Sequence, residues 1–164
     1  MAVARVYLET SFFSECVTIR TGTIDLGRRA TSLHWWRSQA SAFDLCISPE
    51  VVRELSSSAF PTEVREPALS MLEGLEVLES TSDVLGVAEL LVQERVMPSP
   101  SVEGDALHVA FSIVHQVEFL LTWNQKHLAN PRKRTHLMVI CARLNLPTPQ
   151  IVTPDLLIVE DTNG

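Results

Sequence analysis

Hydrophobic and polar positions divide the chain into two kinds of segment that follow each other in turn. Short apolar or alternating runs predict strands at 2–8, 43–47, 75–79, 117–122 and 150–152. Apolar residues at helical spacing predict helices over 23–40, from 49 to about 56, from about 62, over 82–96, from about 105 to 115 and over 134–144. Parallel strands need crossover connections, so this order predicts an α/β three-layer sandwich with helices on both faces of a mostly parallel sheet of four or five strands.

Several residues mark where these elements begin and end. The polar run Glu9–Ser11 interrupts the first apolar strand, and Thr21 or Thr23 is a suitable N-cap for the helix that follows. Ser48 and Pro49 form an N-cap followed by a proline at the first helical position. The segment 97–100 contains two prolines and predicts a loop, because proline cannot continue a helix.

Length and composition predict one soluble domain. A chain of 164 residues is close to one average domain, which we assign to residues 1–158, with 159–164 as a disordered tail. No stretch approaches the roughly 18 apolar residues of a membrane span, and the N-terminus lacks the features of a signal peptide. The three cysteines are an odd number at wide spacing and indicate reduced core thiols, which favours a cytoplasmic protein.

The formal charge of −7 argues against general attraction to nucleic acid. A negative molecule repels a polyanion, so any contact with RNA must be local. Two short basic runs could supply it, Arg28–Arg29 and Arg132–Arg134, although such runs are more often solvated surface.

Candidate chemistry gathers where the predicted strands end. Glu9 closes the first strand, Glu54 lies in the helix after the second, Asp105 lies in the first turn of a later helix, and Asn124 follows a buried strand. The carboxyl ends of parallel strands share one edge of the sheet, where ligand sites form. Each residue also has a plain structural reading, such as a first-turn acid favoured by the helix dipole. Acids gathered together need a cation, and oxygen ligands suit Mg²⁺ or Mn²⁺.

Four segments, YLETSFFS, SPEVVREL, GDALHVAFS and FLLTWNQKHLAN, resemble the PIN-domain family, the fold of VapC-like toxins. The resemblance spans almost the whole chain. It implies an endoribonuclease in which Glu9, Glu54 and Asp105 hold Mg²⁺ or Mn²⁺, while the Ser11 hydroxyl helps to position the metal or its water. It also implies an RNA substrate, a small antitoxin protein as partner, and a homodimer.

Two residues depart from the family pattern. Glu9 stands where an Asp is more usual, and Asn124 occupies the position where many relatives have another acid. The loss of one negative charge weakens a second metal site. A rival hypothesis is therefore a catalytically weakened PIN fold that acts as a protein- or RNA-binding module. A phosphatase that uses an aspartate nucleophile would need a D-x-D string after the first strand, which Glu9–Ser11 does not provide.

The helix that begins near Asp105 also carries a polar stripe. It consists of Asp105, His108, Ser112 and His115, and the spacing predicts that it points away from the core. His108 could donate to a carboxylate or contact phosphate, although an exposed histidine is more often incidental. Lys126 lies just beyond Asn124 and could contact RNA phosphate through its charge.

Other features add little. The histidines and cysteines have no zinc spacing, and the glycine motifs of dinucleotide, P-loop and serine-hydrolase sites are absent. The helices near Trp35–Trp36 or Leu90–Leu91 offer apolar surfaces for the implied homodimer, although paired tryptophans more often fill a core or an interface.

Overall fold

The computed structural model describes residues 2–160, and its centre is a sheet of five strands. All neighbouring strands are parallel, and their order across the sheet is β3-β2-β1-β4-β5. The strands are β1 (Arg5–Leu8), β2 (Asp44–Ile47), β3 (Glu76–Val77), β4 (Phe119–Leu121) and β5 (Gln150–Val152). Tyr7 of β1 is in register with Cys46 on one side and with Leu120 on the other. The predicted parallel α/β architecture is therefore confirmed.

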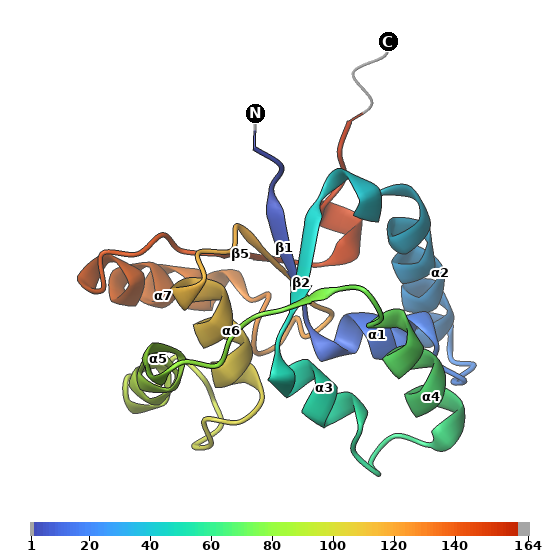
Figure 1. Cartoon of the computed structure of the whole chain (residues 1–164), viewed down its shortest axis with the longest axis horizontal. Helices are drawn as coiled ribbons and strands as arrows, with labels where there is room; N and C mark the ends of the chain where they lie inside the picture. The colour runs from blue at the N-terminus through green and yellow to red at the C-terminus, as the bar shows by residue number, and fades with distance from the viewer. Residues whose placement is uncertain (1, 161–164) are drawn as a thin grey trace.

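Helices cover both faces of this sheet. They are α1 (Thr10–Cys16), α2 (Thr23–Ser38), α3 (Pro49–Leu55), α4 (Thr62–Met71), α5 (Ser82–Gln93), α6 (Asp105–Val114) and α7 (Pro131–Arg143), with 3₁₀ turns η1 (Ala40–Ala42) and η2 (Pro154–Leu156). In Figure 1, α1, α2 and α4 lie to one side of β1 and β2, and α5, α6 and α7 lie to the other. Helix α3 packs against α1, α4 and α6 below the strands, so it faces the carboxyl ends of β1 and β2.

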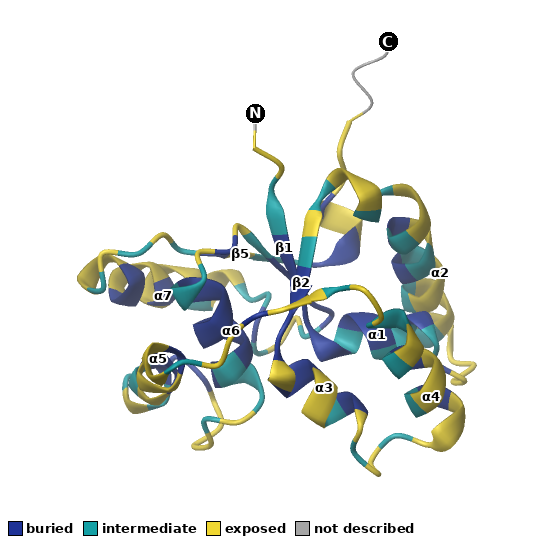
Figure 2. Cartoon of the chain, viewed as in Figure 1, coloured by how far each residue is buried: buried dark blue, intermediate teal, exposed yellow. Residues whose placement is uncertain are grey.

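The core lies between the sheet and the two helical layers. Val6, Tyr7 and Leu8 are fully buried because β1 is the middle strand and has a helical layer on each side. Such burial on both faces explains why the central strands are continuous apolar runs. Figure 2 shows the buried residues of the helices turned towards this centre and the exposed residues turned outwards. Within residues 2–160, no helix is both long and apolar enough to cross a bilayer.

Helix α1 is the element that the sequence pattern did not predict. Its residues, TSFFSEC, include few strong helix formers, so local preference alone does not favour a helix here. Glu9 caps its first turn, and Phe12 and Phe13 are fully buried. Tertiary packing of these two aromatic rings therefore decides the conformation of the segment.

Several element boundaries differ from the predicted ones. The N-cap of α2 is Gly22 rather than either threonine, and α7 begins at Pro131, three residues earlier than predicted, because Asn130 caps it. The strand predicted at 75–79 is reduced to two residues at the edge of the sheet. The predicted tail includes 161–164, which lie outside the described residues, whereas the backbone N–H of Val159 still donates to Gln39.

The two helical surfaces suggested for a homodimer consist largely of core residues. Trp35 is 1% exposed and donates its indole N–H to the carbonyl of Leu157, while Leu91 is fully buried. Trp36 and Leu90 are only partly exposed. The apolar pattern of these helices is therefore explained mainly by packing within the chain. The three cysteines are also buried, and all are free thiols, as predicted.

Candidate functional site

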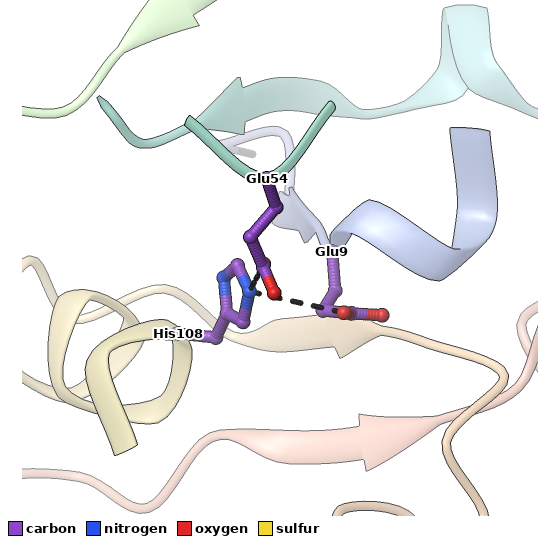
Figure 3. Close-up of side chains that lie close together, drawn as sticks. All are labelled: Glu9, Glu54 and His108. Carbon is purple, nitrogen blue, oxygen red and sulfur yellow. Dashed lines mark hydrogen bonds and ion pairs between the residues drawn. The ribbon is translucent and has the colours of Figure 1, made fainter. Parts of the chain in front are cut away.

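The carboxyl edge of the sheet brings together side chains from distant parts of the chain. Glu9, Glu54 and His108 each offer one ligand atom, and these atoms all lie within 4.8 Å of one another. Figure 3 shows the three side chains converging from the end of β1, from α3 and from α6. Glu9 and His108 are buried, whereas Glu54 is partly exposed and opens the cluster towards solvent.

Glu9 is held rigidly by one of its two carboxylate oxygens. Its Oε2 accepts hydrogen bonds from the Ser11 backbone N–H at 3.0 Å, from the Ser11 hydroxyl, and from the Thr122 hydroxyl at 2.8 Å. Its Oε1 has no hydrogen-bond donor among the described residues and lies 3.8 Å from Nε2 of His108. One oxygen is therefore fixed by the protein, and the other faces the cluster.

Ser11 also ties β1 to β4. Its hydroxyl oxygen accepts the backbone N–H of Trp123 at 2.8 Å while its proton goes to Glu9. In the structure Ser11 thus holds the carboxylate of Glu9, in addition to the role beside the metal that the family resemblance implies.

Glu54 meets the buried His108 at the centre of the cluster. Its Oε1 accepts the Thr10 hydroxyl at 2.7 Å and forms a hydrogen bond with Nε2 of His108. The other nitrogen of this imidazole, Nδ1, lies 2.6 Å from the Tyr7 hydroxyl, which in turn lies 2.7 Å from the Ser48 hydroxyl. A buried chain of hydrogen bonds therefore fixes the ring of His108, and both of its nitrogens are engaged.

The prediction that the polar stripe of α6 points away from the core is wrong. His108 and Ser112 are both fully buried, because α6 packs against α5, α3 and β4. A helix enclosed on several sides can turn polar residues inwards when each has a partner, as His108 does with Glu54 and Ser112 with the His108 carbonyl. His108 is therefore buried rather than exposed, and its contact with a substrate stays a prediction.

Asp105 stands beside this cluster and pairs with Asn124. The amide nitrogen Nδ2 of Asn124 lies 3.3 and 3.4 Å from the two carboxylate oxygens of Asp105. Oδ1 of Asn124 accepts the backbone N–H of His127 at 3.1 Å. Because that N–H can only donate, it fixes the oxygen of the amide on the His127 side and turns the NH₂ group towards Asp105. His108, not Asp105, is the third member of the close cluster.

The charges of the site are strongly coupled. Burial works against ionisation of Glu54, but the hydrogen bond and charge of His108 outweigh it, so the pKa of Glu54 is lowered. Burial likewise opposes protonation of His108, but the hydrogen bond to Glu54 and the charge of Glu9 together raise the pKa of His108. Burial raises the pKa of Asp105. The imidazolium form of His108 is thus the positive group that faces both glutamates.

Two further residues support the site and were missed in the sequence. Glu50 is buried at the start of α3, where its carboxylate pairs with Arg53 and accepts the backbone N–H of Gly104 at 2.9 Å. This contact anchors the turn that precedes Asp105. Tyr7, inside an apolar strand, holds His108. An acid directly after a strand-end Ser-Pro was a usable signal for Glu50, whereas nothing local distinguishes Tyr7 from a core residue.

Lys126 is exposed in the loop after β4. No hydrogen bond or ion pair joins its ammonium group to the cluster among the described residues. Within residues 2–160, the group of Glu9, Glu54 and His108 is the one set of three such side chains close enough to share an ion.

Two solved structures share the fold of this chain. Over 91% of this chain and 98% of the matched chain, it superposes with VapBC2 from Rickettsia felis, solved bound to a DNA fragment from their promoter, with a TM-score of 0.58 and 14% identity. Over 74% of this chain and 92% of the other, it superposes with Mycobacterium tuberculosis VapC20, a sarcin-ricin loop cleaving toxin, with a TM-score of 0.57 and 19% identity. No model of a protein family matches the chain, and no curated protein does. The chain therefore has the α/β fold of the VapC PIN domains, as the resemblance of its sequence segments implied.

Proposed function

We propose that the protein is a divalent-metal-dependent endoribonuclease of the PIN class and the toxin of a toxin–antitoxin pair. The observation that carries the proposal is the convergence of Glu9, Glu54 and His108 within 4.8 Å, beside Asp105, at the carboxyl edge of a VapC-like fold. Carboxylates brought together in a partly buried site repel one another unless a cation compensates their charge. The imidazolium of His108 supplies one positive charge against the three carboxylates of Glu9, Glu54 and Asp105, and the remaining negative charge supports a metal site.

The donor atoms fit Mg²⁺ or Mn²⁺. Oε1 of Glu9 and Oε2 of Glu54 are the two carboxylate oxygens of the cluster that accept no hydrogen bond among residues 2–160. Hard oxygen donors suit these ions. A Cβ at Gly104 would lie 4.0 Å from Oε2 of Glu54, so the glycine leaves space beside this oxygen. Asp105 supplies further oxygens at the rim, and we propose Glu9, Glu54 and Asp105 as the metal ligands.

His108 has a positioning role in this proposal. Both of its nitrogens are engaged, one by Glu54 and one by Tyr7, so the ring aims the Glu54 carboxylate rather than offering a lone pair. When bound, the divalent ion supplies a water of lowered pKa and stabilises charge on the phosphate. The chain's own contribution is to fix Glu9 through Ser11 and Thr122 and Glu54 through Thr10 and His108, so that both carboxylates are preorganised.

The remaining parts of the proposal follow from the likeness to VapC chains. VapC20 cleaves the sarcin-ricin loop, and VapBC2 is a complex of two kinds of chain. By analogy we propose an RNA substrate, a small antitoxin partner, a homodimer and a cytoplasmic location for this protein. Light scattering of the purified chain tests the homodimer directly.

The decisive experiment is cleavage of total RNA by purified protein with Mg²⁺ or Mn²⁺. We expect the wild type to cut and Glu9→Gln and Asp105→Asn to lose at least about a hundredfold in rate, since each removes a ligand charge. Glu89→Gln is a matched control, because Glu89 is exposed on α5 and forms no ion pair among the described residues. Equal cutting by all four proteins would identify a contaminating nuclease and reject the proposal.

A second candidate function is a binding module with the same fold, and Asn124 is the observation that favours it. Its amide already donates to Asp105, so one charge expected of a four-acid site is replaced by a hydrogen bond. Titration with Mn²⁺ separates the two functions. Absence of cleavage and of thermal stabilisation in the wild type, with both gained in Asn124→Asp, would establish the binding module.

A further inference from the structure

Positive charge is concentrated in one continuous part of the chain. From Phe119 to Pro154 there is no Asp or Glu, but there are five Lys or Arg residues. This segment therefore carries a formal charge of +5, and the rest of the chain, with eight basic and all 20 acidic residues, carries −12. The segment contains β4, the loop that follows it, α7 and β5. The net charge of −7 therefore does not reveal that this segment, called the basic lobe below, is strongly basic.

The same lobe contains a cavity of about 210 Å³. Its apolar wall includes Met97, Leu128, Leu137 and Ile151, and its polar wall includes Lys133 and Arg134. The volume is below the roughly 300–1,000 Å³ of pockets that hold drug-sized ligands, so it suits one flat ring or one side chain. An apolar wall beside cations is the chemistry that receives a stacked base next to its phosphate.

One loop joins the lining of the cavity to the acidic site. The loop of residues 124–130 folds back on its first residue, Asn124. The backbone carbonyl of Asn124 accepts the backbone N–H groups of Leu128 and Ala129 at 3.1 and 2.9 Å. Leu128 and Ala129 line the cavity, while the side chain of Asn124 contacts Asp105. Asn124 therefore contacts the lining of the cavity through its backbone and Asp105 through its side chain, so the two sites adjoin across this residue.

Four of the five cations of this lobe are not used for folding, whereas Arg143 pairs with Glu94. Lys126, Arg132, Lys133 and Arg134 form no ion pair within residues 2–160. The last three lie in the first turns of α7, where the helix dipole disfavours positive charge by about 0.3–1 kcal/mol each. Much of the outward face of α7 is exposed (Figure 2). These residues therefore cost stability and remain available to an anionic partner.

We propose that the cavity and its basic rim bind the RNA next to the cleaved phosphodiester. One unstacked base lies against Leu128 and Ile151, and Lys133 and Arg134 contact the adjoining phosphates. This inference rests on the proposed ribonuclease function for its ligand. An acidic peptide is the other class of ligand that such a rim attracts, but it would leave the apolar cavity beside the acidic site unused.

Binding is tested without cleavage, by fluorescence anisotropy of a short labelled single-stranded RNA in the presence of a chelator. We expect Lys133→Ala with Arg134→Ala to weaken binding at least tenfold at about 50 mM salt. The slope of log affinity against log salt should fall by about 1.4, since each lost contact to a single strand accounts for about 0.7. Arg20→Ala with Arg37→Ala removes the same charge from exposed positions outside the lobe and should leave affinity and slope unchanged.

The base site has its own variant. Ala129→Leu adds three carbon atoms at the cavity from a partly exposed position, and should weaken RNA binding about fivefold with no change in the salt slope. Equal melting temperatures show that each variant is folded. Unchanged binding by the Lys133 and Arg134 variant, or an equal loss in the Arg20 and Arg37 control, would overturn the proposal. Displacement of RNA by poly-glutamate at equal charge would instead identify an acidic peptide surface.

The outcomes for binding and for cleavage are distinct. RNA bound through Lys133 and Arg134 by a protein that does not cut with Mn²⁺ would reject the nuclease and retain the binding surface. Cutting that is indifferent to the Lys133, Arg134 and Ala129 variants would retain the nuclease and reject the surface.

Discussion

The contact between Asn124 and Asp105 allows a quantitative test of the acidic site. In the variant Asn124→Asp, a carboxylate oxygen replaces the amide nitrogen that lies 3.3 and 3.4 Å from the Asp105 oxygens. A hydrogen bond to a charged group becomes a repulsion between two negative charges. The burial that raises the pKa of Asp105 makes this repulsion stronger than it would be at the surface.

The size of the effect follows from this distance. Two unit charges about 3.4 Å apart repel by about 5 kcal/mol at an effective dielectric constant of 20. Both side chains are partly exposed, so solvent screening reduces this to about 2–3 kcal/mol. For a chain of this length, each kcal/mol lowers the melting temperature by about 2–4 °C. We therefore expect Asn124→Asp to melt about 5–10 °C below the wild type at pH 8 with a chelator present.

Thermal unfolding under three conditions completes the test. At pH 5 the deficit should shrink, since one carboxyl of the pair gains a proton and the repulsion is lost as the pH falls. With Mn²⁺ at a hundred times the dissociation constant of its complex with the variant, the free energy of unfolding of the variant should rise by about 2.7 kcal/mol. Asn130→Asp is the control from the same loop, because Asp is an equally good N-cap for α7, although this variant also loses the hydrogen bond that the Asn130 amide donates to the Lys126 carbonyl.

One outcome would refute the reasoning. If Asn124→Asp melted with the wild type at pH 8 and gained no more from Mn²⁺ than the wild type does, the two side chains would not face each other across a cation site. A loss of the same size in Asn130→Asp would mean that any added charge destabilises this loop.

Three further predictions concern the buried side chains. Tyr7→Phe removes the hydroxyl that His108 contacts, so urea unfolding should show a loss of about 1–3 kcal/mol from groups left without a partner. The lowered pKa of Glu54 adds stability that is lost as the pH falls below about 4.5, and the raised pKa of His108 adds stability that is lost as the pH rises beyond about 6.5. With a chelator present, the deficit of Glu54→Gln in urea unfolding should therefore be greatest between these values, and a deficit independent of pH would contradict the ion pair. Burial raises the pKa of Cys16 and Cys46 to about 12, so a thiol reagent at pH 8 should label them only as the protein unfolds, and rapid labelling of the folded protein would show that they are accessible.

The sequence by itself determined the order of elements and the edge on which the chemistry lies. Apolar runs such as those of β1 and β4 mark buried strands, because a strand covered on both faces has no polar side. Since parallel strands place their carboxyl ends together, the positions of Glu9 and Asn124 directly after two such runs are enough to assign both residues to one edge. These features depend on local pattern and on topology, both of which the sequence specifies.

Only the tertiary structure decided which side chains meet and which way they point. Helix α1 forms because Phe12 and Phe13 are buried in the core. These contacts are long-range, and the weak helix preference of the segment does not reveal them. His108 turns inwards because α6 is enclosed by other helices, so helical spacing alone could not tell a buried polar stripe from an exposed one. The pairing of Asn124 with Asp105 depends on an amide orientation that the His127 N–H fixes across a loop. Spacing along the chain specifies a face of an element, whereas its partners are specified by packing between elements that are far apart in sequence.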